Sequence, residues 1–212
     1  MSNLPYLPQF LYLPAFLLFH KDFVVSYIGA FGLHRGLDTA IKAMPLLLEK
    51  VPNARLLLIG VNKRMQKLAQ KLQKLAEEIG VSDRVAFFEW QDFRKIPSWI
   101  EASDVGLIPH RSNPHTNATI PNKLFQYICL GKPVVVSDCP PLKRIVESSR
   151  SGLVFEAGNP VALGAALSKL ADEELRKELG ANGREAVRQI YNWQKDARKL
   201  IHLYQELDTS EC

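Results

Sequence analysis

"DFVVSYIGAFGLHRGLDTAIKAMPLLLEKVPNARLLLIG", residues 22–60, places two apolar runs on either side of a segment with helical periodicity. The first run, Asp22–Gly29, is rich in β-branched and aromatic residues, and the second, Ala54–Gly60, is apolar almost throughout. The apolar positions of the intervening helix are Leu37, Ile41, Met44 and Leu48. Strands without polar alternation are buried on both faces. The stretch therefore predicts a right-handed βαβ unit with two parallel strands.

The same alternation continues along the chain. Further strands are expected at Arg84–Glu89, Asp104–Pro109, Pro133–Ser137 and Gly152–Glu156. Amphipathic helices are expected before Gly80, at Pro97 and at Pro121, and three more at Val161–Ala171, Glu173–Ile190 and Trp193–Leu207. This order predicts an α/β fold, a Rossmann-like doubly wound parallel sheet of about six strands. We expect an apolar linker or interdomain segment at residues 1–22, the Rossmann-like domain at 23–190 and a C-terminal helix at 191–212.

Composition narrows the function classes. Of 212 residues, 47% are hydrophobic and 23% charged, which suits a single domain with a substantial core. The net charge of +5 fits an anionic ligand or an acidic membrane surface, and the dispersed basic residues do not favour nucleic acid. The three cysteines form no C-x-x-C pair, which favours the cytoplasm. His110 and His115 have no nearby cysteine or carboxylate in sequence, so no metal site is expected.

The apolar run "FLYLPAFLLF", Phe10–Phe19, is shorter than the roughly 20 residues that a membrane span needs, and Pro14 interrupts it. No lysine or arginine precedes it, so it lacks the charged start of a signal peptide. Three interpretations remain open: a linker packed on a partner domain, a surface strand or helix, and a segment that contacts a membrane.

Ligands of a doubly wound sheet bind beyond the carboxyl ends of the strands, near the switch in strand order. That rule selects the loops at 29–36, 60–63, 89–94 and 109–122. The first loop, "GAFGLHRG", carries Arg35 but has neither the G-x-G-x-x-G fingerprint nor a P-loop, and no carboxylate follows the strand that ends at Gly60. A plain strand-to-helix turn is the alternative interpretation of this loop.

The loop at 109–122 is long and polar, and it leads into a helix that we expect to open at Pro121. The N–H groups of Asn122, Lys123 and Leu124 would then face an anion, and the Lys123 ammonium would add charge. A solvent-exposed loop with a good helix start is the alternative. Loops of this length within a compact domain are usually functional.

Several motifs resemble, in order and spacing, those of the group 1 glycosyltransferases, family 4 of the GT-B fold. The longest is "IPNKLFQYICLGKPVVVSDCPPLKRIVESSRSGLVFEAGNPVALGAAL", residues 120–167, which is similar to the family's P-x-K-L-F-E-Y-M-A-x-G-K-P-V-V pattern and the segment after it. The others are "YIGAFGLHRG", "NARLLLIG", "DRVAFFEW", "WIEASDVGLIPH" and "YNWQKDARKLIHLYQEL". The resemblance covers about residues 23–207 and identifies the chain as the C-terminal, donor-binding half of such an enzyme.

The resemblance implies transfer of a sugar from a nucleotide sugar, with retention at the anomeric carbon and without a cofactor. Cations and helix dipoles would neutralise the nucleoside diphosphate that leaves. No Asp-x-Asp motif is present, which suits a metal-independent reaction. The missing partner would be an N-terminal acceptor-binding domain, so the isolated domain is expected to be inactive. A membrane surface or a lipid-linked acceptor is a further expected partner, which would place the protein on the inner membrane face.

The family's contact residues map unevenly onto this chain. Arg35 matches a family lysine that contacts the diphosphate, whereas Ala30 replaces a family arginine. Ala118 and Gln126 replace the two glutamates of an E-x7-E motif, the second of which accepts ribose hydroxyls. The residues expected at the donor site are Gly29, Ala30, Gly32, Arg35, Asn117, Thr119, Ile120, Pro121, Asn122, Lys123 and Gln126. Glu89, Trp90 and Gln91 are expected near the nucleobase, with a surface turn as the alternative.

These departures leave two other hypotheses open. The chain is a nucleotide-binding or subunit-assembly module whose catalytic contacts have decayed, or it belongs to an epimerase with the GT-B fold. If the chain is instead an active transferase with altered donor contacts, Asn117 or Thr119 would partly substitute for the carboxylate lost at Ala118, and Lys123 would restore the positive charge missing at Ala30. The base, the sugar and the acceptor are not readable from these residues.

Overall fold

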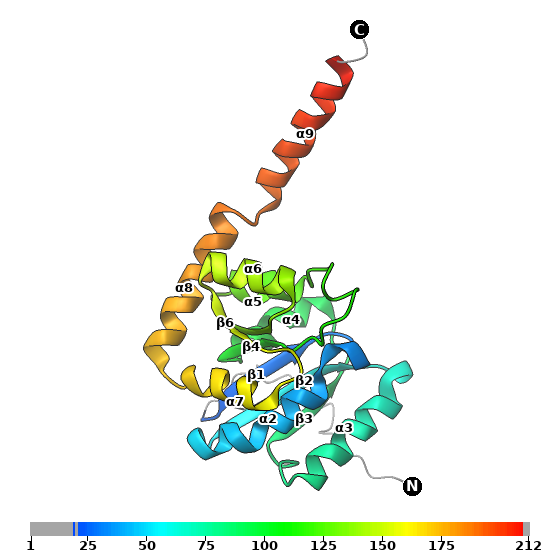
Figure 1. Cartoon of the computed structure of the whole chain (residues 1–212), viewed down its shortest axis with the longest axis vertical. Helices are drawn as coiled ribbons and strands as arrows, with labels where there is room; N and C mark the ends of the chain where they lie inside the picture. The colour runs from blue at the N-terminus through cyan, green and yellow to red at the C-terminus, as the bar shows by residue number, and fades with distance from the viewer. Residues whose placement is uncertain (1–18, 20, 210–212) are drawn as a thin grey trace.

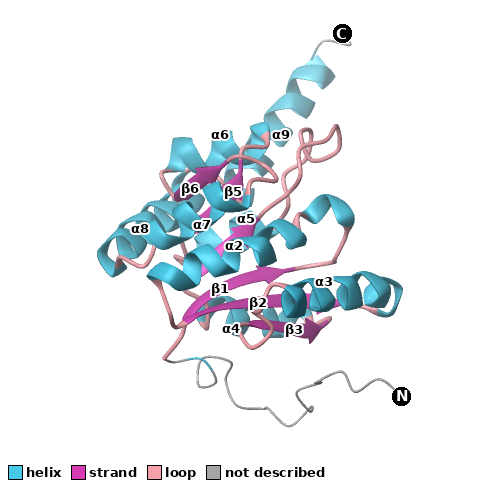
Figure 2. Cartoon of the chain, turned by 60° about the horizontal axis from the view of Figure 1, so that its bottom comes forward, coloured by secondary structure: helices cyan, strands magenta, loops and turns pink. Residues whose placement is uncertain are grey.

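The computed structural model describes Phe19 and residues 21–209, which form a single six-stranded sheet with helices on both sides (Figure 1, Figure 2). The strands are β1 (Phe23–Ile28), β2 (Ala54–Val61), β3 (Val85–Glu89), β4 (Val105–Ile108), β5 (Val134–Ser137) and β6 (Gly152–Phe155). Their order is β3-β2-β1-β4-β5-β6, and every neighbouring pair is parallel. The predicted fold class is confirmed, including the number of strands.

The α-helices are α2 (Leu37–Lys50), α3 (Gln66–Glu78), α4 (Ile96–Glu101), α5 (Lys123–Cys129), α6 (Pro140–Ser149), α7 (Pro160–Lys169), α8 (Glu173–Gln189) and α9 (Trp193–Thr209). Three single turns of 3-10 helix, η1 (Leu33–Arg35), η2 (Lys63–Met65) and η3 (Phe93–Lys95), precede α2, α3 and α4. The buried residues of α2, α3 and α7 form one core cluster, and those of α4, α5 and α6 form another. These two sets of helices therefore cover opposite faces of the sheet.

The central strand β1 contributes to both cores. Val25 and Tyr27 pack with the α2 side, whereas Val24 and Ile28 pack with the α5 side. Successive side chains of a strand point to opposite faces, so an apolar strand without alternation supplies both layers. This is why the run at 23–28 predicts a buried parallel strand.

Helix α5 is attached to β1 through Tyr127. The Tyr127 hydroxyl donates to the Ser26 carbonyl oxygen at 2.8 Å, and the Ser103 hydroxyl donates to the Ser26 Oγ at 2.7 Å. The aromatic ring lies against Gly106 of β4, where a Cβ would come within 2.4 Å of the ring. Burial raises the pKa of the Tyr127 phenol, so it stays a neutral donor. These contacts set the position of α5 over the junction of β1 and β4.

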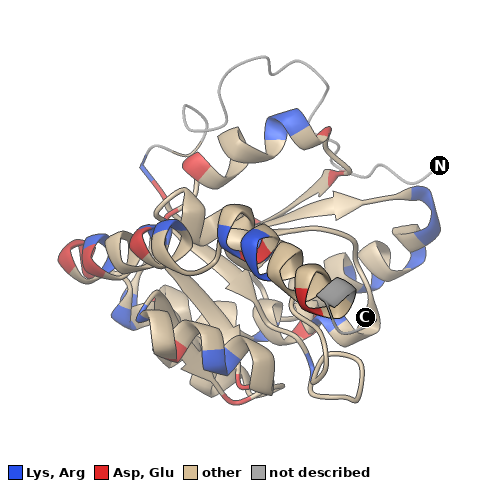
Figure 3. Ribbon diagram, turned by 90° about the horizontal axis from the view of Figure 1, so that it is seen from above, with Lys and Arg blue, Asp and Glu red and all other residues tan. Residues whose placement is uncertain are grey.

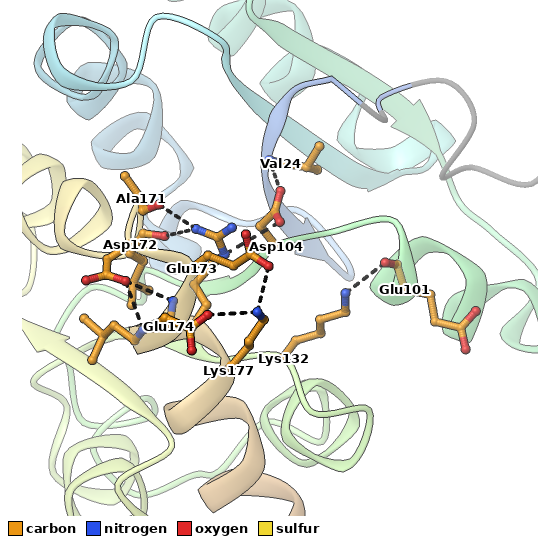
Figure 4. Close-up of polar contacts among 12 residues, drawn as sticks. Val24, Glu101, Asp104, Lys132, Ala171, Asp172, Glu173, Glu174 and Lys177 are labelled. Atoms are coloured by element: carbon orange, nitrogen blue, oxygen red, sulfur yellow. Dashed lines mark hydrogen bonds and ion pairs between the residues drawn. The ribbon is translucent and has the colours of Figure 1, made fainter.

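At the edge of the sheet where the strands begin, Asp104 joins β1 to the start of α8 (Figure 4). Its Oδ2 accepts from the Val24 N–H at 2.7 Å, and its Oδ1 lies 3.7 Å from Nε of Arg176. Arg176 also donates to the carbonyl oxygens of Leu170 and Ala171 at 2.6 and 2.9 Å. The end of α7 and the start of α8 are thereby held to the sheet.

Asp104→Ala is expected to lower the free energy of unfolding by about 1–3 kcal/mol, because the Val24 N–H loses its acceptor in a partly buried place. Urea unfolding followed by circular dichroism measures this. Asp83→Ala is the control, since the Asp83 carboxylate is 74% exposed and pairs only with its neighbour Arg84. The control should change stability by less than about 0.5 kcal/mol. Equal effects of the two substitutions would contradict the role given to Asp104.

Helix α9 extends away from the sheet domain (Figure 1). The Asn192 side chain connects it to α8: Nδ2 donates to the Arg188 carbonyl oxygen at 2.9 Å, and Oδ1 accepts from the Lys195 N–H at 3.0 Å. Large apolar side chains along α9 are exposed, among them Trp193 at 71% and Tyr204 at 63%. Large exposed apolar side chains along one helix are unusual where only solvent surrounds that helix.

Two sequence-based expectations need comment. Helix α5 begins at Lys123, two residues later than the expected start at Pro121. The apolar segment at 1–22 lies almost wholly outside the described residues. Of that segment, Phe19 packs in the core cluster on the α5 side, and the Arg55 guanidinium lies 5.6 Å from the centre of its ring.

Candidate functional site

The strand order 3-2-1-4-5-6 changes direction between β1 and β4, and their carboxyl ends therefore form the crevice where such sheets bind ligands. The loop 29–36 leaves β1 at this point, and the loop 109–122 leaves β4. A backbone hydrogen bond from the Arg111 N–H to the His34 carbonyl oxygen, 3.0 Å long, holds the two loops together. The sequence-based rule for the ligand site thus selects two loops that are in contact.

Glycines determine the path of the first loop. Gly36 has φ of 65°, and a Cβ there would lie 1.8 Å from the Pro109 carbonyl oxygen. The Tyr27 hydroxyl donates to the Ala30 carbonyl oxygen at 2.7 Å and fixes the first turn. Gly29, with φ of 138°, lies over Lys123, whose Nζ would be 2.6 Å from an added Cβ. No bulkier residue would allow this close approach of the loop to β4 and α5.

The second loop is ordered by its own side chains. The Asn113 Oδ1 accepts from the N–H groups of His115 and Thr116 at 2.9 and 3.0 Å. The buried Thr116 hydroxyl donates to the Arg111 carbonyl oxygen at 2.6 Å. Asn117 pairs with Ser112, while Thr119 donates to the His115 carbonyl oxygen at 2.8 Å. Asn117 and Thr119, both expected at the donor site, are therefore exposed but engaged within their own loop.

Cationic side chains gather where the two loops meet. Arg35 Nη1 lies 3.0 Å from Nε2 of the buried His110, and Lys123 Nζ lies 3.6 Å from the centre of the Tyr27 ring. The rings of His34 and His115 meet edge to face with centroids 5.7 Å apart. We call these five residues, Arg35, Lys123, His34, His110 and His115, the cationic cluster, after its two cationic members Arg35 and Lys123. Such a cluster at the carboxyl edge favours an anionic ligand.

The pKa values of the cluster follow from burial and mutual repulsion. Burial and the nearby Arg35 hold the pKa of the Lys123 ammonium well below its usual value. Burial and Arg35 also lower the pKa of His110 to about 3, so its imidazole is neutral at physiological pH. The pKa of His34 is lowered for the same two reasons. An anion bound here would offset the repulsion between Arg35 and Lys123 and would favour the charged form of Lys123.

Two nitrogen atoms of the cluster are buried without a hydrogen-bond partner among the described residues: Nε2 of His34 and Nδ1 of His110. The Arg35 guanidinium only donates, so Nε2 of neutral His110 accepts and the proton is on Nδ1. Buried polar atoms usually have partners. The two orphaned atoms indicate that the cluster is incomplete without a ligand or water.

The start of α5 differs from the expectation. Asn122 is its N-cap residue, and the Leu124 N–H donates to the Pro121 carbonyl oxygen at 3.0 Å, so Leu124 does not offer its N–H to an anion. The Lys123 ammonium does lie at the candidate site, where it packs between Gly29 and the Tyr27 ring. Gln126 lies one turn further along α5, half-buried, without a side-chain hydrogen bond to another described residue. Its amide is thus available to a ligand.

The residues expected at the nucleobase lie apart from the cationic cluster. Glu89 ends β3, which is two strands from β1, or roughly 10 Å at the usual strand spacing. Gln91 donates to the Glu89 carbonyl oxygen at 3.0 Å and accepts from Trp99 Nε1 at 3.3 Å. Trp90 is 60% exposed. The Gln91 amide is therefore engaged within this turn, whereas the Trp90 ring is exposed.

The structure brings Gly29, Ala30 and Lys123 together around Tyr27, and Arg35 beside His110. Gly32 precedes η1, and Asn122 and Gln126 lie at the start of α5. Asn117, Thr119 and the 36% exposed Ile120 lie along the second loop. Sequence reasoning missed three contributors: Tyr27, His34 and His110. Their signal was positional, since Tyr27 and His110 lie at the carboxyl ends of predicted strands and His34 precedes Arg35.

Comparison with known proteins identifies the family. A family profile described as "Glycosyl transferases group 1" matches residues 12–186, most of the chain. The chain belongs to this family. The predicted group 1 glycosyltransferase membership is thus confirmed.

Individual members of the group 1 family are distant. D-inositol 3-phosphate glycosyltransferase from Corynebacterium efficiens is 27% identical over 192 residues, which cover 89% of this chain and 44% of the relative. Sucrose-phosphate synthase from Thermosynechococcus elongatus superposes with a TM-score of 0.78 at 27% identity, over 93% of this chain and 47% of that one. Anabaena Alr3699/HepE in complex with UDP and glucose gives 0.76 at 19% identity, over 90% and 50%. The chain spans about half or less of the length of these proteins.

The described residues contain neither a metal-ligand cluster nor a membrane-spanning helix. Within Phe19 and 21–209, no three His, Cys, Asp or Glu side chains are grouped so as to hold a metal ion. None of the helices in the same part of the chain is both long and apolar enough to cross a bilayer.

Proposed function

We propose that this chain is the C-terminal, nucleotide-sugar-binding half of a retaining group 1 glycosyltransferase of family 4. The main support is that Lys123 lies against the loop 29–36, which carries Arg35, at the switch point of the sheet. Two cations and a glycine-rich backbone at this place suit a diphosphate. No carboxylate forms an ion pair with either cation among the described residues, so their charge is available to the ligand.

The donor is arranged along the carboxyl edge in this proposal. The diphosphate contacts Arg35, Lys123 and the backbone at Gly29, Ala30 and Gly32. The ribose reaches Gln126, and the nucleobase extends towards Trp90 and its neighbours. The transferred sugar lies beside the second loop, near Asn117, Thr119 and Ile120. The neutral Gln126 amide forms a weaker bond to ribose hydroxyls than a carboxylate would.

The relatives support a nucleotide-sugar ligand. The structurally similar Anabaena protein was solved with UDP and glucose, and the Corynebacterium relative is named a glycosyltransferase. The leaving diphosphate would be stabilised by Arg35 and Lys123, so we propose a metal-independent reaction. The free cysteines Cys129 and Cys139 fit a reducing compartment, and we propose the cytoplasm.

Transfer requires a second domain in this proposal. The chain covers 44% of the Corynebacterium relative, and the exposed apolar stripe of α9 offers a surface for the remaining part. Trp193, Leu200, Tyr204 and Leu207 share one face of α9 by their spacing. The acceptor would bind mainly to that other domain, so the isolated chain would bind the donor without transferring the sugar.

A specific observation also favours a second candidate function. Ala30, Ala118 and Gln126 stand where the family pattern has an arginine and two glutamates. A nucleotide-binding or assembly module without catalysis would retain the cationic cluster and tolerate these changes. Nucleotide binding by itself is common to both candidates, whereas transfer after addition of the second domain belongs to the first alone.

Calorimetric titration of the chain with UDP, GDP and ADP tests the proposal. At least one nucleoside diphosphate should bind, and Arg35→Ala should weaken its binding about 10–100-fold, since it removes a charge-assisted contact. Lys169→Ala is the control, because it removes the same charge from the exposed end of α7. The absence of binding by all three nucleotides would contradict the donor-site proposal. Equal affinities of wild type and Arg35→Ala would contradict the placement of the diphosphate.

A further inference from the structure

A leucine-lined groove lies beside the donor site, between η1 and the start of α2 on one side and α3 on the other. Its volume is about 450 Å³, within the usual range for a site that holds a small molecule or a chain segment. Five leucines form most of its wall: Leu33, Leu37, Leu68, Leu72 and Leu75. The groove opens at the same carboxyl edge of the sheet as the donor loop, because Gly32 of that loop also lines it.

Leu33 is the most exposed of these leucines, with 79% of its surface accessible. Leu37 and Leu72 are buried at the floor, with 2% and 4% accessible. Leu68 and Leu75 pack only partly against the core. An apolar strip that runs from a buried floor to a projecting leucine would be stabilised by an apolar ligand.

The charges at the rim are almost all positive. Asp38 is the only carboxylate in the wall, and it is paired with Arg111 and with Lys42 at 3.7 Å. Lys71 also lines the groove and forms no ion pair with another described residue. The two cations paired with Asp38 exceed its charge, and Lys71 adds a further positive charge, so the groove has a positive rim.

The exposed face of η2 and α3 extends this positive rim. It carries Lys63, Arg64, Lys67, Lys71 and Lys74, all of which are exposed. Of these five, only Lys74 forms an ion pair among the described residues, with Glu78 at 3.6 Å. Figure 3 shows Lys and Arg at the side of the domain where α3 lies. A juxtaposed apolar groove and unpaired basic face is complementary to an anionic amphiphile.

We propose that this groove and the basic face of α3 dock the chain on an anionic phospholipid membrane. An acyl chain enters between the leucines, and the lipid phosphate pairs with Lys71. The remaining α3 cations attract the negatively charged surface. Neither signal suffices by itself, because stable attachment to a bilayer needs an apolar insertion and a basic patch together. The docking requires no nucleotide, although Gly32 belongs both to the groove wall and to the proposed donor site.

Co-sedimentation with vesicles tests this docking. The chain should sediment with vesicles of phosphatidylcholine and phosphatidylglycerol, and not with phosphatidylcholine alone. Lys67→Gln together with Lys71→Gln should weaken binding roughly 25-fold, about fivefold for each cation near the surface. Leu33→Ser should weaken vesicle binding by a similar factor, because the apolar leucine side chain no longer inserts into the bilayer. Neither change should lower the melting temperature, because Lys67, Lys71 and Leu33 are exposed.

Matched controls remove the same chemistry elsewhere. Lys169→Gln together with Lys195→Gln removes two exposed cations, and Leu203→Ser removes a leucine that is 52% exposed on α9. Both controls should bind vesicles as the wild type does. Excess glycerol phosphate should not release the protein from the vesicles, because the free headgroup lacks the acyl chain.

Three outcomes would overturn the docking. Binding that survives Leu33→Ser but is lost in the lysine variant would be electrostatic only. Binding that survives both variants would arise elsewhere, for instance in the apolar sequence at residues 1–18. A wild-type chain that ignores vesicles but forms dimers, with dimerisation lost in Leu33→Ser by analytical ultracentrifugation, would show that a second copy covers the groove.

Discussion

Gly36→Ala is expected to lower the free energy of unfolding by about 2–5 kcal/mol. About 1–2 kcal/mol comes from holding alanine at a φ of 65°, in the left-handed region. The rest, about 1–3 kcal/mol, comes from the overlap of the new methyl with the Pro109 carbonyl oxygen, 1.8 Å away. This backbone oxygen cannot move without displacing the loop 109–122. Urea unfolding gives the free energy directly.

Gly80→Ala separates the two contributions. Gly80 has φ of 73°, close to that of Gly36, but nothing lies within 4 Å of an added Cβ. This variant should lose only the backbone contribution, about 1–2 kcal/mol. If the two variants lose the same stability, the contact between Gly36 and Pro109 has no energetic weight. Gly36→Ala should also weaken nucleotide binding under the proposed function, because the second loop leaves its place beside His34.

Lys123→Met is expected to raise the stability of the ligand-free chain and to weaken nucleoside diphosphate binding about 10–100-fold. Methionine has a similar length and removes a buried charge that Arg35 repels. The contact between the ammonium and the Tyr27 ring offsets part of the burial cost, about 0.5–2 kcal/mol, so we expect a net gain on the order of 1 kcal/mol. Thermal unfolding with and without UDP measures both effects.

The pH dependence of stability checks the same residue. The pKa of Lys123 is lower in the folded chain than in the unfolded one. Between those two values the unfolded chain binds more protons, so the stability of the wild type should rise with pH towards about 10.4. Lys123→Met should lack this rise. Lys132→Met is the control for ligand binding: burial also lowers the pKa of Lys132, but its ammonium donates to the Glu101 carbonyl oxygen at the opposite edge of the sheet. Loss of UDP binding in that control would contradict the site.

The fold was predictable because its signals are local. The run at 23–28 contains only residues that suit a strand with two buried faces, and β2, β4 and β5 repeat that character. Helix ends were predicted within a few residues wherever a cap or glycine follows the apolar period. The start of α5 was placed two residues early because Pro121 and Asn122 satisfy the usual rules for a helix start, whereas α5 begins at Lys123 with Asn122 as its N-cap.

The site was predictable as a place but not as a set of contacts. The switch-point rule depends only on strand order, and two of the four loops that it selects, 29–36 and 109–122, are in contact in the structure. That the Lys123 ammonium lies on the Tyr27 ring depends on the packing of α5 against β1, which Tyr127 determines. The position of His110 after a predicted strand is visible in the sequence, but its contact with Arg35, 75 residues away in the chain, is not. Such pairings are tertiary, and no spacing rule contains them.

Because α9 is long and is connected to α8 at Asn192, a small rotation at Asn192 displaces the far end of α9 strongly. The 17 residues of α9 correspond to a rod of about 25 Å at 1.5 Å per residue. A rotation of about 10° at Asn192 would therefore move the far end of α9 by about 4 Å, close to the rise of one helical turn. The Asn192 side-chain amide connects the end of α8 to the first turn of α9. Contacts within a few ångströms of Asn192 therefore determine the direction of the whole helix.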